Sequence, residues 1–109
     1  MELEELKAET AKFFAQLEAE GGLPAQAVAV FRFLPEGPDA DWDAFSEAAE
    51  AGGFEVSWYE AEGDEPECLE VETPPGVPSA AWIWSWEEPL ILLGALHGFA
   101  AEGWGIEGV

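Results

Sequence analysis

Apolar side chains recur at helical spacing over the first twenty residues, and acidic side chains fill the positions between them. The apolar positions are Leu3, Leu6, Phe13, Phe14 and Leu17. Gly21 and Gly22 follow and favour an end to the helix. The pattern predicts an amphipathic helix from Glu2 to Glu20, within a terminal segment 1–22, whose apolar stripe docks on its own chain or, as the alternative, on a second copy.

Residues 26–34 (QAVAVFRFL) are rich in valine and phenylalanine, which predicts a strand. One face of this strand would carry alanine and phenylalanine side chains, and the other face valines and Arg32. After a loop that contains two prolines, Asp39 or Asp41 is placed to cap a second helix that runs to about Ala51.

Two later segments, 54–61 and 67–73, alternate apolar and polar side chains and are separated by a short polar loop. This pattern predicts an antiparallel pair of strands with one solvated face. The core would receive Phe54, Val56, Trp58, Leu69 and Val71, and the solvated face would carry Glu55, Ser57, Tyr59, Cys68, Glu70 and Glu72.

Trp82, Trp84 and Trp86 recur at a period of two residues. In a strand this spacing places three indoles on one face, whereas a helix would separate Trp84 from the other two. The period favours extended structure. The three indoles could cover the core or, as the functional alternative, form an exposed patch that anchors a partner.

From Pro89 to Ala101 the chain is almost wholly apolar, which predicts a helix that is covered on more than one side. We expect this helix to begin near Glu87 and to end near Ala101, with Pro89 in the first turn, where proline is tolerated. Residues 103–108 would then add a last short strand.

The order of elements is one helix followed by two β-α-β units, with an extra short strand at the tryptophans. This order predicts an α+β fold of the ferredoxin-like, split βαβ type, with two helices on one face of an antiparallel sheet and an added N-terminal helix. The first and third strands should be central. We expect one domain over residues 1–109, with the ferredoxin-like core in 26–109.

The charge of the chain narrows the choice of partners. Asp and Glu number 24 against three Lys and Arg, so the formal net charge is −21, while 49% of the residues are hydrophobic. Such a charge repels nucleic acid and anionic membranes and attracts basic surfaces. We therefore expect no direct binding to nucleic acid or membrane. The alternative is that the acidity is only a solubility trait.

Three absences point to the cytoplasm. Cys68 is the only cysteine, so no internal disulfide can form. The acidic start MELEELKAE has the wrong charge for a signal peptide. The apolar run from Pro89 to Ala101 is shorter than the ~20 residues that a membrane span needs.

Candidate catalytic and metal-binding groups are weak. Asp39, Asp41 and Asp43 have the spacing of a calcium loop, but Ala44 stands where that loop needs glycine. His97 is the only histidine, and no spacing identifies a nucleophile for it. We predict a protein that is not an enzyme and has no metal or cofactor.

Three short segments carry a family resemblance. They are GFEVSWYE (53–60), LEVET (69–73) and AAEGWGIE (100–107). They resemble the regulator of ribonuclease E activity, type B, family over about residues 27–109. Within that span, Glu102 stands where the family has a tyrosine, and residues 73–88 (TPPGVPSAAWIWSWEE) have no counterpart.

The resemblance implies a small acidic ferredoxin-like protein that binds and inhibits a ribonuclease. The predicted open face of the sheet is compatible with this role, because it carries acids where an RNA-binding domain of this fold carries aromatic and basic groups. The candidate partner-binding residues are Arg32, Glu55, Tyr59, Glu70, Glu72 and Glu107, together with Trp82, Trp84 and Trp86.

The resulting hypothesis is a non-enzymatic regulator that docks on the basic surface of a ribonuclease or another nucleic-acid enzyme, where its carboxylates mimic phosphates. Two alternatives belong to other classes. One is a structural module that forms a homodimer through the first helix and the tryptophans. The other is a domain that binds a small molecule between the sheet and the last helix.

Overall fold

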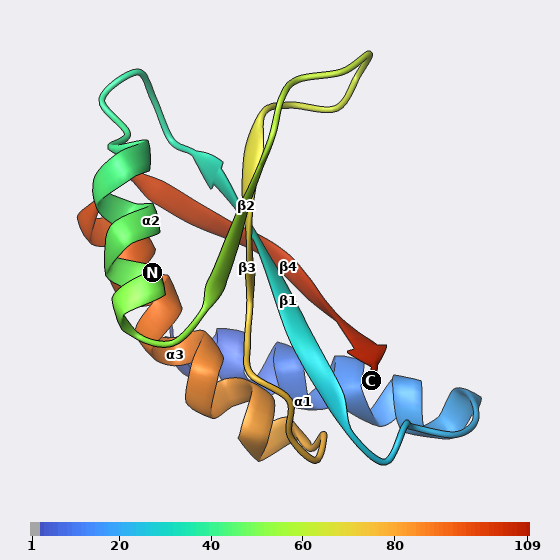
Figure 1. The fold of residues 1–109 in the computed structure, drawn as a ribbon. Coiled ribbons are helices and arrows are strands. Elements are labelled where there is room, and N and C mark those ends of the chain that lie inside the picture. Colours follow the sequence, from blue (N-terminus) through green and yellow to red (C-terminus); the bar gives the residue numbers. More distant parts are fainter. Residues whose placement is uncertain (1–2) are drawn as a thin grey trace.

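The computed structural model describes residues 3–109, which form three helices and four strands (Figure 1). The elements are α1 (Leu3–Glu20), β1 (Ala27–Pro35), α2 (Trp42–Ala51), β2 (Glu55–Tyr59), β3 (Cys68–Glu72), α3 (Ala80–Leu96) and β4 (Phe99–Gly108). The predicted start of the first helix at Glu2 lies outside the described residues, and its end at Glu20 is confirmed.

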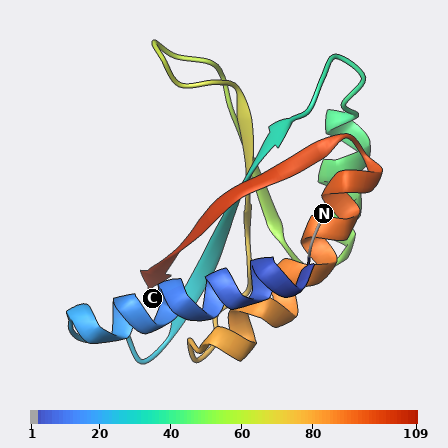
Figure 2. The same ribbon diagram turned by 180° about the vertical axis from the view of Figure 1, so that it is seen from behind.

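The four strands form one antiparallel sheet in the order β2-β3-β1-β4. The first and third strands are therefore central, as the ferredoxin-like order requires. Helices α2 and α3 gather on one side of the twisted sheet (Figure 1). Helix α1 lies alongside α3 on the β4 side of the molecule (Figure 2). The α+β fold with an added N-terminal helix is confirmed.

The core lies between the sheet and the helices because the odd-numbered residues of β1 face the helices. Phe33 contacts Phe45 of α2 with ring centroids 5.0 Å apart, and Phe45 is also 5.0 Å from Phe99. All three rings are fully buried. Burial of an aromatic or large aliphatic side chain contributes about 1.5–3 kcal/mol each, so this cluster holds α2 firmly on the sheet.

Helix α2 begins where one of the two candidate caps predicted it. Asp41 is the N-cap, and its side chain accepts a hydrogen bond of 3.0 Å from the Ala44 backbone N–H. The helix ends at Ala51, as expected, and Gly53 then adopts a φ of +96° that favours glycine.

The expectation of extended structure at the tryptophans is wrong, because α3 already begins at Ala80 rather than near Glu87. Ser79 caps this helix by accepting a hydrogen bond of 3.0 Å from the Trp82 backbone N–H. Ile83 and Leu90 are buried one above the other at helical spacing, which fixes the helix on the core. No strand precedes α3 directly within residues 3–109.

Pro89 lies inside α3 rather than in its first turn. The helix also ends earlier than expected, at Leu96 instead of Ala101. Gly98 allows the abrupt end, because its φ is +85° and a Cβ there would lie 3.0 Å from the Cα of Ala40. Strand β4 consequently begins at Phe99 and is four residues longer than the predicted 103–108.

A glycine explains how the segment before α3 fits against the sheet. Gly76 exchanges two backbone hydrogen bonds of 2.9 Å with Ala27, so this stretch extends the pairing of β1. The indole of Trp82 packs directly on Gly76, where a Cβ would lie 2.6 Å from the indole nitrogen.

Among residues 3–109, no helix has the length and apolar character needed to cross a bilayer.

Candidate functional site: the acidic face of the sheet

The face of the sheet turned away from the helices brings the sheet residues predicted for partner binding together. We call this surface the acidic face; its members are Arg32, Glu55, Tyr59, Glu70, Glu72 and Glu107. The strand register produces it directly. Glu72 of β3 is the cross-strand partner of Glu55, and Glu70 is the partner of Arg32. Residue alternation places these side chains on the same side.

Glu72 is the most crowded carboxylate of the acidic face. Partial burial raises its pKa first, and the hydrogen bond and charge of Glu55 raise it further. The charges of Glu107 and Glu70 act in the same direction. Like charges opposed across strands disfavour the ionised form. Four glutamates on three strands therefore concentrate negative charge around one position.

Arg32 is the one cation of the acidic face. Its two terminal nitrogens contact the carboxylates of Glu65 at 3.4 Å and Glu102 at 3.3 Å. The Cys68 side chain raises the pKa of Arg32 most, followed by Glu102. Surface ion pairs of this kind contribute about 0–1 kcal/mol. Within residues 3–109, the ion pairs of Arg32 are therefore with Glu65 and Glu102 and not with the glutamates around Glu72.

The contact with Glu102 was not predicted from the sequence. The pairing of β1 with β4 shifts register between Arg32 and Phe33, because Gly103 pairs with Arg32 and Ala101 with Phe33. Glu102 is the extra residue of this β-bulge, and its carboxylate reaches the guanidinium. In the sequence, Glu102 is marked only by the resemblance, because it stands where the family has a tyrosine.

Cys68 and Tyr59 are direct cross-strand partners at the end of the acidic face. Tyr59 is 48% exposed, as expected for a solvated position. Cys68 was expected to face solvent among glutamates, but its exposed fraction is 0%. Leu69 faces the core, so Cys68 lies on the opposite side of β3, where its side chain interacts with Arg32.

The three tryptophans do not form a common surface, because two residues of a helix correspond to about 200° of rotation. Trp82 packs on Gly76, and Trp86 packs edge-on against Phe54 with ring centroids 5.2 Å apart. Both indoles pack against the core, whereas Trp84 is not among the side chains packed against it. The predicted row of three indoles on one face is therefore wrong, and the interpretation that they cover the core fits Trp82 and Trp86.

The remaining candidates take structural positions. Asp41 caps α2, and His97 caps the end of α3, with its ring 6.3 Å from that of Phe45. Across residues 3–109, no three or more His, Cys, Asp or Glu side chains lie close enough together to hold a metal ion.

Trp58 was expected in the core, but it is 52% exposed at the edge of the sheet.

The comparisons with known proteins add one positive finding. The family model described as "Regulator of ribonuclease activity B" matches residues 7–106, which is nearly the whole chain. The matched region includes every residue of the acidic face except Glu107. The comparison with curated proteins found no match.

Proposed function

The chain belongs to the regulator of ribonuclease activity B family, and we propose that it regulates a ribonuclease by docking its acidic face on a basic surface of that enzyme. A ribonuclease binds a polyanion, so its RNA-binding surface is basic. A protein that presents closely spaced carboxylates competes for that surface. The proposed effect is inhibition of RNA cleavage.

The observation that carries this proposal is the crowding of carboxylates around Glu72. Glu55 and Glu72 are opposed across two strands, and their proximity raises the pKa of Glu72. A lysine or arginine of a partner would relieve this repulsion and add charge-assisted hydrogen bonds. The site therefore favours a cationic protein surface over RNA, which would add further negative charge.

The proposed role needs no catalytic group and no cofactor of this chain, and it is exerted where the ribonuclease acts, in the cytoplasm. The tryptophans of α3 are not part of the proposed contact, because α3 lies on the face of the sheet opposite the acidic face (Figure 1). Tyr59 supplies the exposed aromatic ring at the border of the acidic face.

The test begins with a pull-down from a nuclease-treated native lysate on the immobilised chain, eluted with a salt gradient and identified by mass spectrometry. We expect a ribonuclease to elute at moderate salt, since exposed charges are screened there. Ribonuclease E, which the sequence resemblance implies, is the first enzyme to assay. Cleavage of a labelled RNA should slow as the chain is added.

The variant with Glu55→Gln, Glu70→Gln, Glu72→Gln and Glu107→Gln should lose about tenfold or more in inhibition. A matched control carries Glu4→Gln, Glu5→Gln, Glu18→Gln and Glu20→Gln on α1, so its net charge is the same. The control should inhibit normally. Equal loss in both variants, or binding that salt does not weaken, would contradict the proposal.

A further inference from the structure

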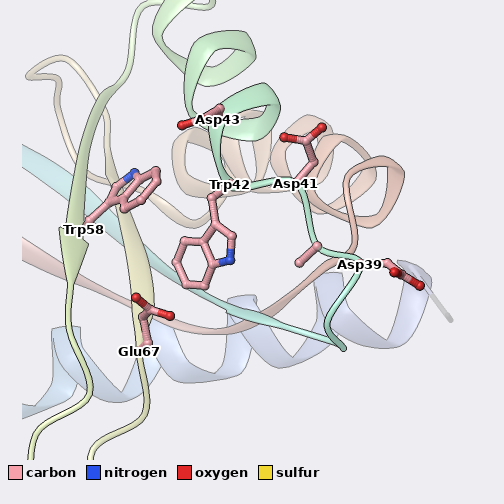
Figure 3. Close-up of a pocket in the computed structure, with 7 residues that line it drawn as sticks. Asp39, Asp41, Trp42, Asp43, Trp58 and Glu67 are labelled. Carbon is pink, nitrogen blue, oxygen red and sulfur yellow. The ribbon is translucent and has the colours of Figure 1, made fainter.

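A second surface lies away from the acidic face, at the edge of the sheet where α2 begins. It is an open pocket of ≈ 580 Å³ lined by Asp39, Ala40, Asp41, Trp42, Asp43, Trp58 and Glu67. Its side chains come from the loop before α2, from the start of α2, from β2 and from the loop before β3 (Figure 3). Two indoles form its wall, and carboxylates surround them.

The two indoles are held in fixed positions. Trp42 packs edge-on against the buried ring of Phe99, with centroids 5.0 Å apart and an interplanar angle of 89°. Trp58 donates a hydrogen bond of 2.9 Å from its indole nitrogen to the Ser46 hydroxyl. The two indoles also contact each other, with ring centroids 5.4 Å apart and an interplanar angle of 51°. A preorganised aromatic wall therefore faces solvent, with Trp58 52% exposed.

The carboxylates have different roles. Asp41 is committed to capping α2, where it accepts the Ala44 N–H. Asp43 and Glu67 lie on opposite sides of the two indoles (Figure 3). Their negative charge adds to the electrostatic attraction that the face of an indole exerts on a cation.

The part of the chain that the structure describes supplies no cation to this pocket. Arg32 is held by Glu65 and Glu102. Lys7 and Lys12 belong to α1, which packs on α3 and, through Phe13 and Trp104, on β4 at the opposite edge of the sheet from β2. An aromatic and anionic pocket without an internal partner is suited to a cation from outside.

We propose that this pocket binds a guanidinium group, the arginine side chain of a basic polypeptide. A guanidinium is planar and weakly hydrated, so it stacks on the exposed face of an indole and donates in-plane hydrogen bonds to carboxylates. Trp58 provides the stacking face, and the carboxylate of Glu67 or of Asp43, one on each side of the indoles, provides the acceptor (Figure 3). The site differs from the acidic face because aromatic stacking, rather than charge density alone, recognises the ligand.

The experiment follows the indole N–H signals of the full chain by nuclear magnetic resonance during titration with the peptide acetyl-Gly-Arg-Gly-Arg-Gly-amide. Trp42→Phe and Trp58→Phe variants assign the two signals. We expect both signals to shift in a saturable manner. Trp58→Ala should weaken binding about two- to fivefold, the size of a cation–π contact at an exposed site. Glu67→Gln keeps the shape of the pocket and should also weaken binding.

Two peptides and one variant serve as controls. The citrulline peptide has the shape of the arginine peptide without its charge and should not bind. The lysine peptide should bind more weakly, because an ammonium cannot stack. Glu70→Gln, on the acidic face, should leave the titration unchanged.

Equal binding of the citrulline or the lysine peptide would overturn the guanidinium assignment. So would shifts confined to indole signals other than those of Trp42 and Trp58. The proposal is independent of ribonuclease regulation, because a variant such as Glu67→Gln alters the pocket and leaves every residue of the acidic face in place.

Discussion

Two glutamates with raised pKa values lie on opposite sides of the sheet, and their surroundings differ. Glu72 on the acidic face has Glu55, Glu70 and Glu107 as neighbours. Glu87 of α3 is buried between α1, α3 and β4, where Thr10 donates a hydrogen bond of 2.5 Å to its carboxylate. Burial raises the pKa of Glu87 most, and the hydrogen bond from Thr10 lowers it.

The difference shows which of the two charges a partner can reach. The excess charge at Glu72 lies on an open surface, so a cationic protein can neutralise it. The charge at Glu87 is buried and its hydrogen-bond donor is the neutral hydroxyl of Thr10, so a proton or a substitution of Glu87 relieves it. The proposed docking of a cationic partner therefore concerns Glu72, whereas the buried charge of Glu87 disfavours the docking of α1.

The largest expected effect comes from removing the donor to Glu87. Thr10→Val keeps the shape of the side chain but removes the donor to the buried carboxylate and the acceptor of the Trp104 indole N–H. The free energy of unfolding at pH 7 should fall by about 1.5–3 kcal/mol, the value of a hydrogen bond to a charged group. Urea denaturation followed by circular dichroism measures it. Thr10→Ser keeps the hydroxyl, so its free energy of unfolding should fall less. An equal fall in both variants would assign the effect to packing of the methyl group.

The pH dependence of stability should have the opposite sign to that of a paired carboxylate. The folded protein holds the proton of Glu87 more tightly than the unfolded chain, in which the pKa is near 4.5. The folded state therefore binds more protons between 4.5 and the raised value, and the free energy of unfolding falls as pH rises through this interval. Glu72 contributes in the same direction.

Glu87→Gln should raise the free energy of unfolding by about 1 kcal/mol at pH 7, because the amide still accepts from Thr10 without burying a charge. It should also flatten the profile between pH 7 and the ordinary carboxylate range. Thermal unfolding at several pH values tests both effects. A profile that keeps its full slope in this variant would contradict the assignment to Glu87.

A smaller gain is expected on the acidic face. Glu72→Gln removes the central carboxylate, and the free energy of unfolding should rise by less than about 1 kcal/mol, because the group is partly solvated. Glu4→Gln on α1 removes one charge from a solvated position and serves as the control. A loss of stability in Glu72→Gln would show that its ionised form is held by a favourable contact.

The smallest expected effect is a difference in how salt changes the stability gained by substituting Glu72 and Glu87. Raising the salt concentration shortens the screening length to about 3 Å at 1 M, which weakens repulsion between exposed carboxylates. The gain from Glu72→Gln should therefore shrink by a few tenths of a kcal/mol in high salt. The gain from Glu87→Gln should persist, because its cause is burial. Urea denaturation at two salt concentrations, of the unsubstituted protein and of the Glu72→Gln, Glu87→Gln and Glu4→Gln variants, gives the comparison.

Much of the fold could be predicted because local signals agreed with the global arrangement. The alternation in β1 and β3, the cap at Asp41 and the order of elements specify the sheet and its open face. Once the strands pair in register, the acidic face follows from alternation. Its residues could therefore be predicted without a structure.

The errors arose where two periodicities overlapped or where tertiary contacts decided. The tryptophans repeat every two residues, but Ser79 caps a helix and Ile83 and Leu90 repeat at helical spacing. Packing of the apolar stripe outweighs the pattern of three indoles. The bulge at Glu102 depends on the pairing of β1 with β4, so no local pattern in β4 predicts it.

The bulge at Glu102 also has a consequence for self-association. Strand β4 is a ten-residue edge strand, long enough to template pairing with another chain. Its irregularity interrupts the row of free backbone groups, and Gly103 and Gly105 weaken its preference for extended structure. Together with mutual repulsion between chains of charge −21, these features guard the edge against fibril-like stacking. In acid, where the carboxylates are neutralised, the repulsion between chains is lost. The irregularity of β4 then remains as the feature that disfavours edge-to-edge pairing.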